Sequence, residues 1–71
     1  MTINIKQVFT DLQNFIRDYK DEPILEMPVG ISISMSGNLM VKYTTEKRVP
    51  VGNIEQAAEV INEWLIKMRK N

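Results

Sequence analysis

Residues 29–45 read VGISISMSGNLMVKYTT and decide the fold. In the first half, valine, isoleucine and methionine alternate with glycine and serine, which is the period of two of a strand with one buried face. Serine, glycine and asparagine at 36–38 are turn residues, and the chain then returns through a second apolar run. The sequence therefore predicts a β-hairpin with strands at 29–36 and 39–45.

The register of this hairpin follows from the requirement that opposed residues share a face. A two-residue loop at 37–38 would place core residues opposite polar ones. A three-residue loop at 36–38 instead puts all the large side chains on one face: Ile31 opposite Tyr43, Ile33 opposite Val41, and Met35 opposite Leu39. We predict this second register, with Asn38 in the left-handed conformation that closes such loops.

Apolar residues at helical spacing precede and follow the hairpin and predict amphipathic helices near 4–20 and 53–70. The stripes are Ile5, Val8, Phe9, Leu12, Phe15, Ile16 and Tyr19 in the first, and Ile54, Ala57, Ala58, Ile61, Trp64, Leu65 and Met68 in the second. Asn4 and Asn53 are expected helix N-caps, with Gln7 and Gln56 at the position that completes a capping box.

The predicted fold class is α+β, in the order α-β-β-(β)-α, with both helices on the apolar face of a small antiparallel sheet. Residues 48–51 are expected to add a short third strand, which Pro50 would confine to an edge. Residues 24–27 are either a lead-in to the hairpin or a separate edge piece. We expect residues 1–71 to form a single small domain.

Composition limits the stabilising devices and the partners open to this chain. It has no cysteine and no histidine, which excludes disulfides and the common zinc sites, so oligomerisation is the remaining device and a homodimer is expected. Nine basic and nine acidic residues cancel, so no overall charge attracts nucleic acid or a membrane surface. The apolar runs are too short for a membrane span or a signal peptide, and a cytoplasmic protein is expected.

The residues needed for catalysis are missing from the pattern. Without histidine or cysteine no nucleophile has an evident base, and the spacing of Ser32, Ser34 and Ser36 is explained by the polar face of a strand. Glutamates of the second helix fall opposite its apolar stripe, and the glycines are isolated rather than grouped in a phosphate loop. We therefore expect no enzymatic activity, no cofactor, no metal and no small-molecule substrate.

The predicted succession of one helix, three strands and one helix resembles the layout of double-stranded-RNA-binding domains, over the whole chain. The resemblance implies phosphate contacts at the start of the last helix, which is rich in lysine in that family. Residues 54–59 read IEQAAE, which is acidic where phosphate would dock. A smaller basic group, Lys42, Lys47 and Arg48, leaves nucleic-acid binding as the alternative function, although charges on a solvated strand edge also discourage strand pairing.

A protein-interaction module is the function that the sequence favours. Met40 falls on the polar face of the hairpin, beside Ser32 and Ser34, where small side chains let another backbone approach. Val60 lies just outside the apolar stripe of the second helix, and Ile66 lies about 80° beyond it. Compact, neutral, cysteine-free chains are frequent among small phage and mobile-element proteins, so we expect a regulatory binding protein of that kind.

Overall fold

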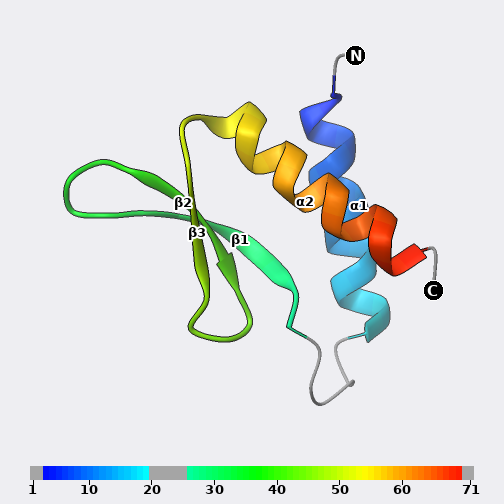
Figure 1. The fold of residues 1–71 in the computed structure, drawn as a ribbon. Helices are drawn as coiled ribbons and strands as arrows, with labels where there is room; N and C mark the ends of the chain where they lie inside the picture. The colour runs from blue at the N-terminus through cyan, green and yellow to red at the C-terminus, as the bar shows by residue number, and fades with distance from the viewer. Residues whose placement is uncertain (1–2, 20–25, 70–71) are drawn as a thin grey trace.

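The computed structural model describes residues 3–19 and 26–69. Helix α1 (Ile5–Tyr19) is followed by three strands, β1 (Pro28–Ile33), β2 (Leu39–Tyr43) and β3 (Arg48–Val51), and by helix α2 (Ile54–Arg69). The strands form one antiparallel sheet in the order β1-β2-β3, and the two helices pack on each other and on the sheet (Figure 1). The predicted α+β fold is confirmed, and so is the third strand at an edge.

The core lies between the helices and the central strand. Val41 and Tyr43 of β2 are buried against a cluster that α1 and α2 complete: Val8, Leu12, Ala57, Ala58, Ile61 and Leu65. All the buried side chains of the described residues are apolar. Burying this surface drives folding at about 25 cal/mol per Å². The two alanines have no bulk to hold α2 away, which is consistent with its packing on β2.

The hairpin has the predicted loop length but a different register. Ile31 pairs with Val41 and Ile33 with Leu39, two residues away from the expected pairing. The loop is residues 35–37, because Ser34 N donates to Asn38 O at 2.9 Å and Gly37 N donates to Ser34 O at 2.9 Å.

The left-handed residue of the loop is Gly37, with φ of 89°, and the prediction of Asn38 was wrong. Glycine adopts positive φ without the steric cost that a Cβ imposes, so it takes this position in preference to the asparagine beside it. Moving the loop by one residue moves the pairing by two, and an even shift keeps every side chain on its face.

Two strand ends therefore differ from the prediction. Met35 belongs to the turn and is fully exposed, so it does not join the apolar face. Ile33 keeps the side shared with Ile31 and Val41, yet 68% of it is exposed, because the end of the hairpin projects past both helices (Figure 1). Alternation along a strand specifies a face, but it does not say how far the covering helices reach.

The approach to β1 is attached to the end of β2. Met27 N donates to Thr44 Oγ1 at 3.2 Å, and Thr44 N donates to Met27 O at 2.9 Å. The register shifts by one residue between Pro28 and Gly30, which is a β-bulge at Val29. Residues 26–27 thus lead directly into β1, whereas residues 24–25 lie outside the described residues.

Both predicted N-caps are confirmed. Asn4 Oδ1 accepts from Gln7 N at 3.0 Å, and Asn53 Oδ1 accepts from Gln56 N at 2.9 Å. The reciprocal half of the box differs at each helix. The Gln56 side chain accepts from Gly52 N at 2.6 Å, one residue before the cap, while Gln7 donates along α1 to Asp11 at 2.9 Å.

We predict that Gly37→Ala lowers the free energy of unfolding by about 1 kcal/mol, because alanine must adopt positive φ in the turn. Gly30→Ala is the matched control, since a Cβ there meets no atom within 4 Å and the backbone conformation is ordinary. Urea unfolding at one protein concentration measures both. Equal losses in the two variants would contradict the turn assignment.

Candidate protein-interaction surface

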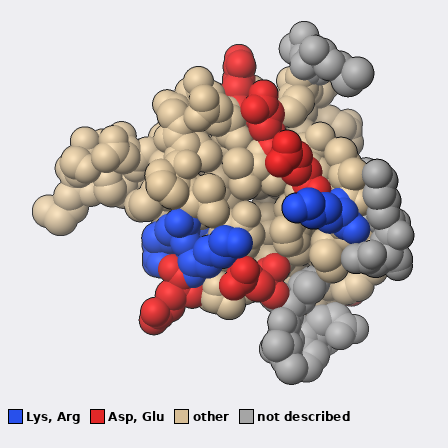
Figure 2. All heavy atoms as spheres, viewed as in Figure 1, with Lys and Arg blue, Asp and Glu red and all other residues tan. Residues whose placement is uncertain are grey.

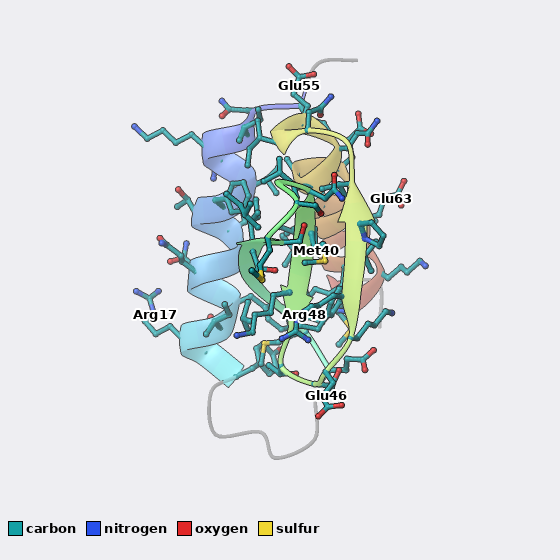
Figure 3. The ribbon with its side chains drawn as sticks, turned by 90° about the vertical axis from the view of Figure 1, so that its left-hand side faces the viewer. Arg17, Met40, Glu46, Arg48, Glu55 and Glu63 are labelled. Atoms are coloured by element: carbon teal, nitrogen blue, oxygen red, sulfur yellow. The ribbon has the colours of Figure 1, made fainter. Side chains whose placement is uncertain are left out.

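The surface of interest is the face of the sheet that points away from the helices, which we call the outer sheet face. Because paired residues share a face, one row across the strands consists of Ser32, Met40 and Pro50. The next row consists of Gly30, Lys42 and Arg48. Figure 3 looks onto this face, with Met40 at its centre and Arg48 below it.

The side chains at the centre of the outer sheet face are uncharged, and one of them carries a hydroxyl group. Met40 and Ser32 are half-buried side by side on neighbouring strands, and Pro50 is exposed. Ser32 Oγ is shielded from solvent and has no hydrogen-bond partner among the described residues. An unpaired buried hydroxyl costs about 1–3 kcal/mol, so this atom favours any partner that brings an acceptor or donor.

Ser34 has a role within the turn. Its Oγ accepts from Asn38 N at 3.1 Å and lies 2.9 Å from Ser36 Oγ. It follows the last residue of β1, so the row that contains Met40 runs through Ser32 and not, as predicted, through Ser34. The structure thus brings Met40 and Ser32 together and places Ser34 at the end of the same hairpin.

The two helical candidates lie on the other layer. Val60 is half-buried and packs against the core cluster, so it belongs to the buried side of α2. Ile66 is 41% exposed near the end of α2. Neither residue joins the outer sheet face, because α2 covers the opposite side of the sheet (Figure 3). The five predicted interaction residues therefore do not form one surface, since three belong to the hairpin, Ile66 is exposed on α2 and Val60 lies on its buried side.

Basic side chains form two groups in Figure 2, one over the sheet and one near the end of α2. The predicted group, Lys42, Lys47 and Arg48, belongs to the end of the sheet where β2 turns into β3. Lys42 and Arg48 are cross-strand partners on the outer sheet face. Arg48 Nη1 donates to the Glu46 carbonyl at 2.8 Å. Among the described residues, Lys42 forms no ion pair, which leaves its ammonium group open to a partner.

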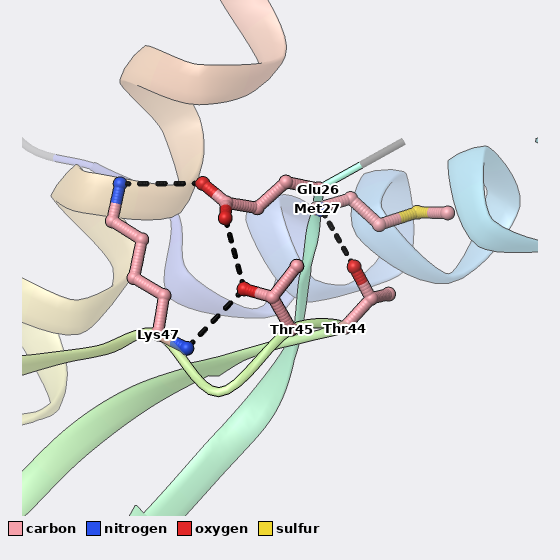
Figure 4. Close-up of polar contacts among 5 residues, drawn as sticks. All are labelled: Glu26, Met27, Thr44, Thr45 and Lys47. Carbon is pink, nitrogen blue, oxygen red and sulfur yellow. Dashed lines mark hydrogen bonds and ion pairs between the residues drawn. The ribbon is translucent and has the colours of Figure 1, made fainter. Parts of the chain in front are cut away.

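Lys47 is held in a local network (Figure 4). Its Nζ lies 3.6 Å from Glu26 Oε1 and 4.8 Å from the centre of the Tyr43 ring. Thr45 Oγ1 donates to Glu26 Oε2 at 2.9 Å and accepts from Lys47 N at 3.2 Å. The network joins the approach to β1 with the turn between β2 and β3. Lys47 is therefore less available to an anion than the sequence suggests.

Acidic side chains follow the exposed side of α2 (Figure 2). Glu55, Glu59 and Glu63 recur every four residues and are all exposed. This confirms that they fall opposite the apolar stripe. The first turns of α2 thus present negative charge, which is unfavourable for phosphate even though the helix N-terminus carries a partial positive charge.

The sequence did not predict the positions of two exposed residues of the sheet. Pro50 was expected at an edge but not beside Met40, and Ile33 was expected in the core. The relevant signal is in the sequence: residues 27–41 carry no charge in a chain that is 25% charged. An uncharged strand at a sheet edge is unusual, because charged side chains commonly protect such edges.

Among the described residues, no three histidine, cysteine, aspartate or glutamate side chains are grouped closely enough to hold a metal ion. Neither helix of that part of the chain is long and apolar enough to cross a membrane. Comparison of the chain with protein families, curated proteins and solved structures finds no significant match.

Proposed function

We propose that this chain is a small cytoplasmic binding protein without catalytic activity, which acts through protein–protein contacts as a homodimer. Its binding surface is the outer sheet face, and its partner is a protein segment that combines large apolar side chains with carboxylates. The observation that carries the proposal is that the helices leave this face uncovered while a methionine occupies its centre.

The shape and chemistry of the outer sheet face support this proposal. Antiparallel sheets often leave one face in water, and such a face is normally lined by polar side chains. Here the central row holds Met40 and Pro50, and the small Ser32 and Gly30 beside them leave room for close approach. Methionine is flexible and polarisable, so it adapts to partner surfaces of different shape.

The charges around Met40 support an acidic partner. Lys42 and Arg48 lie in the row next to Met40, on the same face. Carboxylates of a bound segment would meet these cations while its apolar side chains cover Met40 and Pro50. Such charge pairs add specificity and speed association more than they add affinity. The chain carries no net charge, so the attraction would be confined to this end.

A library of displayed peptides tests the proposal with the purified protein as bait. We expect selected peptides to combine at least one large apolar residue with aspartate or glutamate. Their binding should fall about tenfold or more in Met40→Glu, which removes the apolar contact and repels carboxylates, and in Lys42→Glu. Fluorescence anisotropy with one selected peptide measures the change.

Met35→Glu is the control, because it makes the same substitution at an exposed methionine of the turn, away from the outer sheet face. Binding should be unchanged in this variant. Peptides without acidic enrichment, or peptides that bind all three variants as well as the original chain, would overturn the proposed surface.

Nucleic-acid binding is the second candidate, and one observation favours it: Lys42 and Arg48 are cross-strand partners, and Lys47 directly precedes Arg48. Two features oppose it. Glu26 and the Glu46 carbonyl already engage Lys47 and Arg48, and the exposed glutamates of α2 would repel phosphates. Of the three basic residues in this group, that leaves Lys42 to displace counterions from a duplex.

We predict no specific binding of an RNA duplex of about 20 base pairs at about 50 mM salt, measured by anisotropy. Binding whose affinity falls steeply as salt rises, and which Lys42→Ala weakens, would instead establish the second candidate. Glu59→Gln serves as the comparison, since removal of one repelling carboxylate should strengthen any real duplex contact.

A further inference from the structure

Among the described residues, none pairs with the outer edge of β1, so this edge of the sheet has free backbone groups. The hydrogen bond from Ser34 N to Asn38 O marks a pair whose backbone groups point at each other. The direction of the backbone N–H and C=O groups alternates along an antiparallel strand. Those of Ser32 therefore also point towards β2, and those of Ile31 and Ile33 point to the free edge. Each of these isoleucines offers one donor and one acceptor to an added strand.

The side chains of β1 do not discourage such an addition. No charged residue occurs between Glu26 and Lys42, and the only proline of the strand is Pro28, at its start. Ile33 is 68% exposed at this edge, which is unfavourable in water. An uncharged, β-branched edge strand is a template for pairing with another chain.

The opposite edge of the sheet is protected. Tyr43 N donates to Lys47 O, so the backbone groups of Lys47 and Val49 point towards β2. The backbone groups of Arg48 and Pro50 point outwards. Pro50 has no backbone N–H to donate, and Arg48 places a charge on this edge. Strand addition is therefore directed to β1.

We propose that β1 pairs with β1 of a second copy of this chain, antiparallel about a twofold axis at Ser32. This proposal specifies the interface of the homodimer in the proposed function and rests on it. In this register Ile31 of each copy opposes Ile33 of the other, and the free donors and acceptors of both residues are paired. The same register keeps the bulge at Val29 and the turn at Met35 out of the ladder.

Neighbouring registers fit less well. An axis at Ile31 would pair Ile33 with Val29, which is in the bulge. An axis at Ile33 would pair Ile31 with Met35, which is in the turn. Both would lose backbone hydrogen bonds at the ends of a short ladder. The axis at Ser32 is the one that uses the regular part of the strand alone.

The axis also brings a partner to the unpaired hydroxyl. Ser32 of the two copies would form a non-hydrogen-bonded pair, in which side chains approach most closely, with Cα atoms about 4.5 Å apart. A serine hydroxyl is both donor and acceptor, so a rotation about χ1 lets the two Oγ atoms bond each other. Within the described part of one chain this atom has no such partner.

A single-cysteine variant tests the register, because the natural chain contains no cysteine. Ser32→Cys should give a disulfide-linked dimer as the main product of mild oxidation, since the Cα separation is within the range for disulfides. Ser34→Cys is the control on the same hairpin. The two copies of residue 34 would lie about 13 Å apart, four residues along the ladder, and should not crosslink.

A charge at the edge tests the interface without a crosslink. In sedimentation equilibrium, Ile33→Lys should weaken dimerisation about tenfold or more, because the ammonium groups and the lost apolar contact oppose pairing. Met35→Lys makes a comparable change at an exposed turn position and should leave dimerisation unchanged. Circular dichroism checks that both variants fold.

The outcomes separate this proposal from the proposed function. A natural chain that stays monomeric at high micromolar concentration would overturn both the dimer and its interface, while peptide binding to the outer sheet face would be unaffected. A dimer that Ile33→Lys does not weaken would place the interface elsewhere. Equal crosslinking of Ser32→Cys and Ser34→Cys, or none by either, would overturn the twofold axis at Ser32.

Discussion

Burial of the central strand between two helices is the constraint on which this structure depends. Val41 and Tyr43 lie on the helix side of β2, and each element of the domain either covers them or extends the surface around them. Ala57 and Ala58 let α2 come close, while Val8 and Leu12 supply the same cover from α1. Because all the buried side chains of the described residues are apolar, this packing requires no buried charge to be compensated.

Because both helices pack on one face of the sheet, the other face is left uncovered by them. Within residues 3–19 and 26–69 the domain has two layers, and no helix or strand of these residues covers the outer sheet face. Met40, the second residue of β2, illustrates the difference, since the side chains of its neighbours Leu39 and Val41 point to the helix side while its own points away. The two faces of one short strand thus differ, since one is buried against the helices and the other lies outside that core.

Much of the fold follows from local patterns, and the misses have physical causes. Alternation in residues 29–43 and the caps at Asn4 and Asn53 act over a few residues, so the sequence reports them directly. The turn required a choice between Gly37 and Asn38, which the cost of positive φ for a Cβ decides. The exposure of Ile33 depends on where the helices end, and local spacing carries no such information. The same limit applies to the candidate site, where Ser32 and Met40 were found together but Val60 turned inwards.

Pro50 has a consequence for the size of any assembly. A sheet that offers a complete ladder on both rims can add copies without end and grow into a filament. Here Pro50 removes a backbone donor from one rim and Arg48 places a charge on it, so edge pairing is directed to the other rim, which is β1. Pairing restricted to one rim stops at two copies, whereas pairing through both rims would continue.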